Sequence, residues 1–157
     1  MNQTHLHLLI THLPIIGSIL GALVLAYGIW TQSIHTKIAA YGLLVISSIG
    51  AGIAYITGEA AEETVEHLQG IVESKIEQHE DFALYALIGL ILLGLFSIIS
   101  LYVTIKKHAL ANLLATVTLL LALLSFGLVA YTGYLGGMIR HTEIGDGAVN
   151  KSSEKSE

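Results

Sequence analysis

Long stretches without a charged side chain divide the chain into four apolar segments. Residues 1–36, 38–58, 82–105 and 108–139 contain no aspartate, glutamate, lysine or arginine. A membrane-spanning helix needs roughly 20 mostly apolar residues, and every one of these stretches is long enough. The pattern therefore predicts an all-α integral membrane protein with spanning helices at about residues 5–30, 37–58, 81–105 and 109–135. Short turns within each half predict an up-down-up-down four-helix bundle.

The segment between the second and third predicted helices has a different character. Residues 59–81 hold eight acidic residues and a single lysine, Lys75. Apolar residues recur among them at roughly helical spacing, which predicts that the helices continue outside the membrane and break near Gly70. We therefore expect a partly helical acidic connection at residues 59–80. Residues 1–145 form one predicted domain, and the polar residues 146–157 are expected to be a disordered tail.

The composition excludes several classes of protein. Hydrophobic residues make up 54% of the chain and charged residues only 12%, whereas a soluble domain carries about 25% charge. The net charge is −5 and no basic stretch exceeds Lys106–Lys107, so a nucleic-acid binder is excluded and the lipid bilayer is the expected partner. Cysteine is absent, which excludes disulfides, thiolate metal sites and iron–sulfur clusters.

The basic residues predict how the helices cross the membrane. The two short turns carry Lys37, Lys106 and Lys107, while the remaining lysines and the arginine are spread over the much longer segments on the other side. Lysine and arginine concentrate in short cytoplasmic loops. We therefore expect both termini and the acidic connection on the non-cytoplasmic side.

Polar residues that could bind a metal gather at one end of the predicted bundle. Antiparallel helices place six of the eight histidines on the side of the acidic connection. His12 is the deepest of these in the sequence; His5 shares its face, and His7 points nearly opposite. Histidines at this depth can simply hydrogen-bond in the headgroup layer. The alternative is a metal site, whose candidate ligands are His12, Glu59, Glu63, His67, His79 and His141.

The kind of metal site depends on which of these residues face one another. Neutral imidazole is a common ligand of haem iron, zinc and copper. Haem b in a four-helix bundle needs two facing histidines, and His12 and His79 form the predicted pair. Glu59 or Glu63 would orient a ligand imidazole or take a proton from quinol. The Glu-x-x-His motifs of di-iron bundles are absent, as are the motifs of common hydrolases.

Four short motifs resemble a bacterial membrane-protein family, domain of unknown function 2231. They are His12-Leu13-Pro14, Thr57-Gly58-Glu59, His79 and Gly136-Gly137, and the resemblance covers roughly residues 5–141. The resemblance implies a four-helix protein of the bacterial inner membrane. Some members are fused to Rieske-type iron–sulfur domains, which implies an electron-transfer setting. The chain departs from the family pattern in its long acidic connection and in residues 140–143.

Three functional hypotheses remain open from the sequence. The first is a redox protein that binds haem b and exchanges electrons with quinol or a respiratory-chain protein. The second is a non-haem protein that binds zinc, copper or iron through the histidine and glutamate cluster. The third is a non-catalytic accessory or structural subunit, so enzymatic activity is left open.

GxxxG spacings at Gly17–Gly21 and Gly133–Gly137 could pack helices within the chain or in a homo-oligomer.

Overall fold

A computed structural model describes residues 3–65 and 73–140, and every element in this part of the chain is a helix. The five helices are α1 (Gln3–Ile10), α2 (His12–Trp30), α3 (Ile34–Val65), α4 (Glu73–Ile105) and α5 (Ala111–Arg140). The all-α prediction is therefore confirmed for the described residues.

The first predicted helix, at residues 5–30, consists of two consecutive helices. Pro14 has no backbone N–H, so it cannot donate to the carbonyl of Ile10, four residues earlier. The helix α1 ends at Ile10, and α2 begins at His12. Thr11 between them keeps right-handed helical angles, with φ −61° and ψ −25°, and its N–H donates to the His7 carbonyl at 3.0 Å. The chain thus passes from α1 to α2 with only a local interruption.

The helices on either side of the acidic connection are longer than their predicted membrane spans. The helix α3 continues to Val65, and α4 already begins at Glu73. The last helix, α5, begins at Ala111 and extends to Arg140, beyond the predicted end at residue 135. The predicted break near Gly70 and the predicted tail at 146–157 lie outside the described residues.

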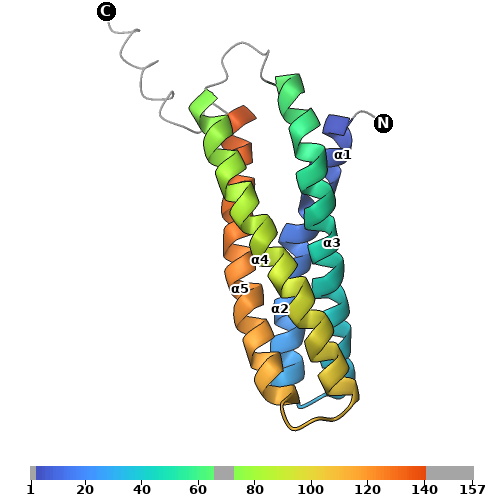
Figure 1. Ribbon diagram of the computed structural model, residues 1–157. Helices are drawn as coiled ribbons and strands as arrows, with labels where there is room; N and C mark the ends of the chain where they lie inside the picture. The colour runs from blue at the N-terminus through green and yellow to red at the C-terminus, as the bar shows by residue number, and fades with distance from the viewer. Residues whose placement is uncertain (1–2, 66–72, 141–157) are drawn as a thin grey trace, which may run out of the picture.

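The long helices lie side by side and leave the molecule with two different ends (Figure 1). At one end, which we call the turn end, residues 31–33 join α2 to α3 and residues 106–110 join α4 to α5. The opposite, terminal end holds the start of α1, the end of α3, the start of α4 and the end of α5. There α1 packs against α3 and α4 packs against α5, and the two pairs diverge from one another in Figure 1.

Each long helix buries one stripe of residues whose spacing alternates between three and four. This spacing corresponds to a period of 3.5 residues, which is the packing pattern of left-handed helical bundles. The stripes consist mainly of small and hydroxyl-bearing residues: Pro14, Ser18, Gly21, Leu25 and Gly28 in α2; Lys37, Ala40, Leu44, Ser47, Ala51 and Ala54 in α3; Ala86, Leu90, Leu93, Ser97, Ser100 and Thr104 in α4; and Ala115, Thr118, Ala122, Ser125, Val129 and Thr132 in α5.

The small residues allow the helix backbones to approach closely. A Cβ atom added at Gly94 of α4 would lie 2.8 Å from the Ser48 Oγ of α3. That hydroxyl donates to the Leu90 carbonyl across the same interface at 2.7 Å. Likewise, a Cβ atom at Gly17 would lie 3.0 Å from the Ser47 Cβ. The Gly17–Gly21 spacing therefore packs α2 against α3 within one chain.

The outward surface of the bundle is apolar. Leucine and isoleucine side chains are exposed along all four long helices, among them Leu23 (59%), Ile56 (76%) and Leu124 (63%). Water would make such a surface costly, whereas lipid tails are equally apolar. Four helices are long and apolar enough to cross a membrane, at His5–Trp30, Ile34–Gly58, Ser74–Ile105 and Ala111–Ile139. These features make the chain a multi-pass membrane protein in contact with the lipid bilayer.

Candidate cofactor site

The imidazole of His7 links α1 to α3 at the terminal end. Its Nδ1 lies 2.9 Å from the Ala54 carbonyl and 3.3 Å from the Thr57 hydroxyl. The ring is half-buried. Its Cε1 atom would lie only 3.3 Å from a Cβ atom placed at Gly58. The glycine therefore leaves room for the ring against the α3 backbone.

The imidazole of His79 is held in the same way between α4 and α5. Its Nδ1 lies 3.0 Å from the Thr132 carbonyl, and the ring is half-buried. A Cβ atom at Gly136 would lie 3.1 Å from the His79 Cε1. Each pair of helices thus contributes one histidine, one backbone carbonyl that accepts from it and one glycine that makes space for it.

The hydrogen bonds fix which ring nitrogen carries the proton in the neutral form. A backbone carbonyl can only accept, so Nδ1 of both rings must be protonated for these bonds to form. Nε2 of each neutral ring then carries a lone pair that can bind a metal. Carbonyl acceptors of this kind also orient metal-bound histidines in known sites.

The two histidines lie at the same end of the molecule, His7 on α1 and His79 on α4. The helix α2, which follows α1, contacts α5 through Ile15, whose Cδ1 would lie 3.0 Å from a Cβ atom at Gly133. The terminal end therefore presents two half-buried imidazoles, one from each pair of helices.

His12 does not share this arrangement. Its side chain is exposed, and its Nδ1 lies 2.9 Å from the Leu8 carbonyl of α1. The predicted pairing of His12 with His79 stays a prediction. The resemblance motif His12-Leu13-Pro14 contributes a buried residue at Pro14, whose carbonyl accepts from Ser47 Oγ at 3.1 Å.

The other predicted ligands contribute no described side chain. Glu59 and Glu63 lie in the last turns of α3, but their side chains are outside the described part of the chain. His67 and His141 lie wholly outside the described residues. Among the residues that the structure describes, no group of three or more histidine, aspartate or glutamate side chains could hold a metal ion. The alternative zinc, copper or non-haem iron site therefore stays a prediction.

His7 was not among the ligands predicted from the sequence, although the spacing of the buried residues places it on the inward side of the helix. The buried stripe of α2 runs through Gly28, Leu25, Gly21, Ser18 and Pro14. Continued backwards with the same alternating spacing, it reaches residues 11 and 7. His7 thus falls on the inward stripe, whereas positions 5 and 12 fall off it. The buried stripe of α4 likewise reaches His79 when it is continued backwards from Ala86 through residue 83.

Comparison of the chain with protein-family models, curated proteins and solved structures gives no match. The resemblance to domain of unknown function 2231 therefore stays a prediction from the four short motifs.

Proposed function

We propose that the chain is a small membrane redox protein that binds haem b through His7 and His79. One observation carries this proposal: two half-buried imidazoles at the same end of the bundle, each oriented by a backbone carbonyl and each beside a glycine. The pair replaces the predicted pair of His12 and His79. In this proposal the protein exchanges electrons with quinol or a respiratory-chain protein.

The number of imidazoles favours haem over a bare metal ion. A structural zinc site needs four ligands and a catalytic one three from the protein. Among the described residues, His7 and His79 are the two half-buried imidazoles of this end, and haem b would need only two such residues because the porphyrin supplies the remaining nitrogens. Gly58 and Gly136 leave room for the two rings against the neighbouring helix backbones.

The residues of this end have separate tasks in the proposed function. The Ala54 and Thr132 carbonyls hold the ligand rings in one tautomer, which keeps both Nε2 lone pairs available. Haem b, when bound, supplies a one-electron couple. Quinol oxidation also releases protons, and Glu80 beside His79, together with the predicted Glu59 and Glu63, offers carboxylates to accept them.

The proposed topology follows from the same assignment. The four helices cross the bacterial inner membrane up-down-up-down, with the terminal end and the acidic connection on the non-cytoplasmic side. Haem b then lies near the non-cytoplasmic surface, where a quinol or a soluble partner reaches it. The lysines of the turn end support this orientation, because short basic turns favour the cytoplasm.

The test is the reduced-minus-oxidised absorbance spectrum of the detergent-purified chain from a haem-sufficient host, with metals measured on the same sample. We expect near-stoichiometric haem with a sharp α band. His7→Ala and His79→Ala should each lower the haem content about tenfold or more, since each removes one of the two residues that would hold the haem. His12→Ala is the matched control and should retain the haem.

Three results would contradict the proposal. A wild-type protein without haem and without metal would leave an accessory subunit as the better hypothesis. Near-stoichiometric zinc, copper or non-haem iron without haem would favour the second hypothesis. Loss of haem in His12→Ala with retention in His7→Ala would restore the pairing of His12 with His79.

A further inference from the structure

A lysine is buried at the turn end, far from every described carboxylate. The Lys37 side chain is only 3% exposed, and its Nζ donates to the Asn112 Oδ1 at 2.7 Å. Aspartate and glutamate are absent from residues 1–58 and 82–142. These ranges include both turns and the helix segments around them, so no carboxylate of the described residues neutralises Lys37.

The position of Lys37 makes its charge more costly. Lys37 lies in the first turn of α3, which begins at Ile34, and Asn112 lies in the first turn of α5, which begins at Ala111. A helix N-terminus carries a partial positive charge, which repels a cation and attracts an anion. Burying an ammonium ion without a counter-charge is unfavourable. A single amide acceptor does not supply that counter-charge.

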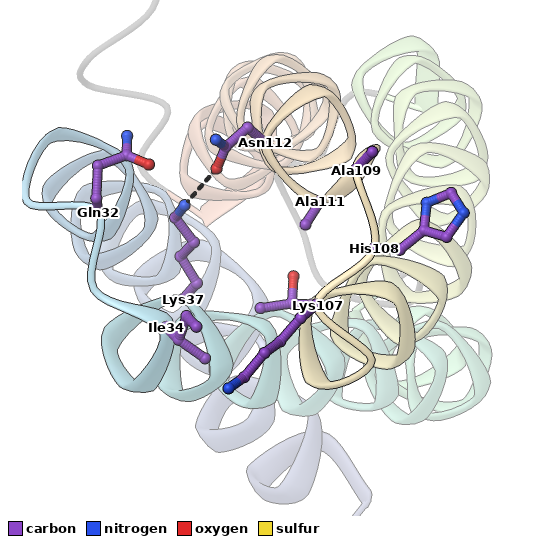
Figure 2. Close-up of a pocket in the computed structure, with 9 residues that line it drawn as sticks. Gln32, Ile34, Lys37, Lys107, His108, Ala109, Ala111 and Asn112 are labelled. Atoms are coloured by element: carbon purple, nitrogen blue, oxygen red, sulfur yellow. Dashed lines mark hydrogen bonds between the residues drawn. The ribbon is translucent and has the colours of Figure 1, made fainter.

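A cavity of about 310 Å³ adjoins the Lys37 side chain. Its lining includes Gln32, Thr104, Lys107, Ala111 and Asn112 besides Lys37. Figure 2 shows the hydrogen bond between the Lys37 and Asn112 side chains, while the His108 ring points away from Lys37. Because the Asn112 Oδ1 accepts from Lys37, its amide nitrogen keeps two N–H groups to donate. The cavity therefore presents donors and positive charge.

The cavity lies at the level expected for lipid headgroups. It is lined by residues of both turns and by the adjoining ends of the apolar spans. Trp30 is 81% exposed at the end of α2, and Lys106 lies 5.8 Å from the centre of the Tyr102 ring. Tryptophan and tyrosine concentrate at the membrane–water interface. Phosphate groups, either of lipids or free in solution, are anions present at this depth.

We propose that the turn-end cavity binds a phosphate group, which the Lys37 ammonium, the Asn112 amide and the first turn of α5 recognise. The phosphate supplies the counter-charge that Lys37 lacks, and the helix N-termini stabilise it. This site is separate from the proposed haem site and does not depend on it.

The test measures the thermal unfolding of the full chain after phospholipid is removed by detergent exchange. Phosphatidylglycerol, a diacylglycerol without phosphate and inorganic phosphate are added in separate titrations, with chloride matching the ionic strength. We expect phosphatidylglycerol to raise the midpoint of the wild type and the diacylglycerol to leave it unchanged. Lys37→Met should bind phosphatidylglycerol about tenfold more weakly or worse, because a charge-assisted bond is lost.

Matched variants separate binding from general effects. Lys106→Gln removes an equal charge from the same end of the bundle, and because Lys106 does not line the cavity, this variant should bind like the wild type. Asn112→Asp places a carboxylate beside the ammonium and supplies the counter-charge internally. It should therefore raise the midpoint without lipid and abolish the response to phosphatidylglycerol. This second variant keeps the test decisive if Lys37→Met fails to fold.

The titrations also identify the source of the phosphate. A Lys37-dependent response to phosphatidylglycerol alone supports a lipid headgroup. A Lys37-dependent response to inorganic phosphate supports the same site with a free ion as its ligand. An equal response of wild type and Lys37→Met to all three additions would overturn the proposal, as would a diacylglycerol effect as large as that of phosphatidylglycerol.

Discussion

At the terminal end of the bundle the imidazole rings of His7 and His79 point inward, whereas at the turn end the ammonium group of Lys37 points inward. Both imidazoles have a backbone carbonyl as partner, and the ammonium has an amide oxygen. A carbonyl fully satisfies the N–H of a neutral imidazole and leaves a lone pair. An amide oxygen leaves the charge of the ammonium uncompensated.

This difference determines what each end can bind. Neutral nitrogen bases with available lone pairs suit a Lewis acid, and thus a metal such as haem iron. A cation without a counter-ion suits an anion. The sequence separates the two chemistries as well, because the residues from Glu59 to Asp81 hold eight acids and both turns hold none. A bundle with one repeated packing pattern can therefore carry two unrelated sites.

The largest effect should come from removing the charged or ligating group at one end only. His79→Leu should lower haem content about tenfold or more while the response to phosphatidylglycerol persists. Lys37→Leu should lower the response to phosphatidylglycerol while the haem content persists. The two positions are independent because His79 and Thr104, which lines the cavity, lie roughly 38 Å apart along α4 at 1.5 Å per residue. Haem absorbance and thermal unfolding of the same samples measure both responses.

Loss of both responses in both folded variants would contradict the separation of the two ends. Far-ultraviolet circular dichroism shows whether each variant keeps its helices. If it does and both responses are lost, the two ends act as one cooperative unit.

A smaller effect is expected from filling the space beside one ligand ring. Gly136→Ala places a Cβ atom 3.1 Å from the His79 Cε1, so the ring must shift relative to the Thr132 carbonyl. We expect the free energy of haem binding to weaken by about 1 kcal/mol, which corresponds to a roughly fivefold higher dissociation constant. At Gly137 a Cβ atom would meet nothing within 4 Å, so Gly137→Ala is the control. Haem titration of the apoprotein measures both, and equal effects would argue against a steric role for Gly136.

The membrane helices could be predicted from the sequence because their determinants are local. Length and the absence of charge locate the four spans, which the structure gives as His5–Trp30, Ile34–Gly58, Ser74–Ile105 and Ala111–Ile139. Pro14 divides the first of these segments into α1 and α2. The helical spacing of apolar residues in the acidic connection predicted that the helices continue past residue 58 and before residue 81, and α3 indeed extends to Val65 while α4 begins at Glu73.

The site was harder to predict because it depends on which face of each helix points inward. The choice of His12 rested on depth along the membrane normal, and the structure exposes its side chain. His7 and His12 lie on opposite faces, as the sequence indicated, but the small-residue stripe favours His7. Lys37 was used only to predict orientation. Its burial depends on the approach of α5, which brings Asn112 to it from 75 positions away in the sequence.

The smallest effect is expected from serine substitutions in the core between the two ends, which test whether this core has a role beyond packing. The Ser97 Oγ on α4 is buried without a hydrogen-bond partner among the described residues. Ser97→Ala removes an unsatisfied hydroxyl, so the free energy of unfolding should stay within about 0.5 kcal/mol of the wild type or rise. Ser100, one turn away, bonds the Thr118 hydroxyl at 2.8 Å, and Ser100→Ala should cost about 1 kcal/mol. Reversible unfolding in mixed detergent measures both variants. If Ser97→Ala instead weakens haem binding or the response to phosphatidylglycerol, the hydroxyl couples the two ends, and their independence is wrong.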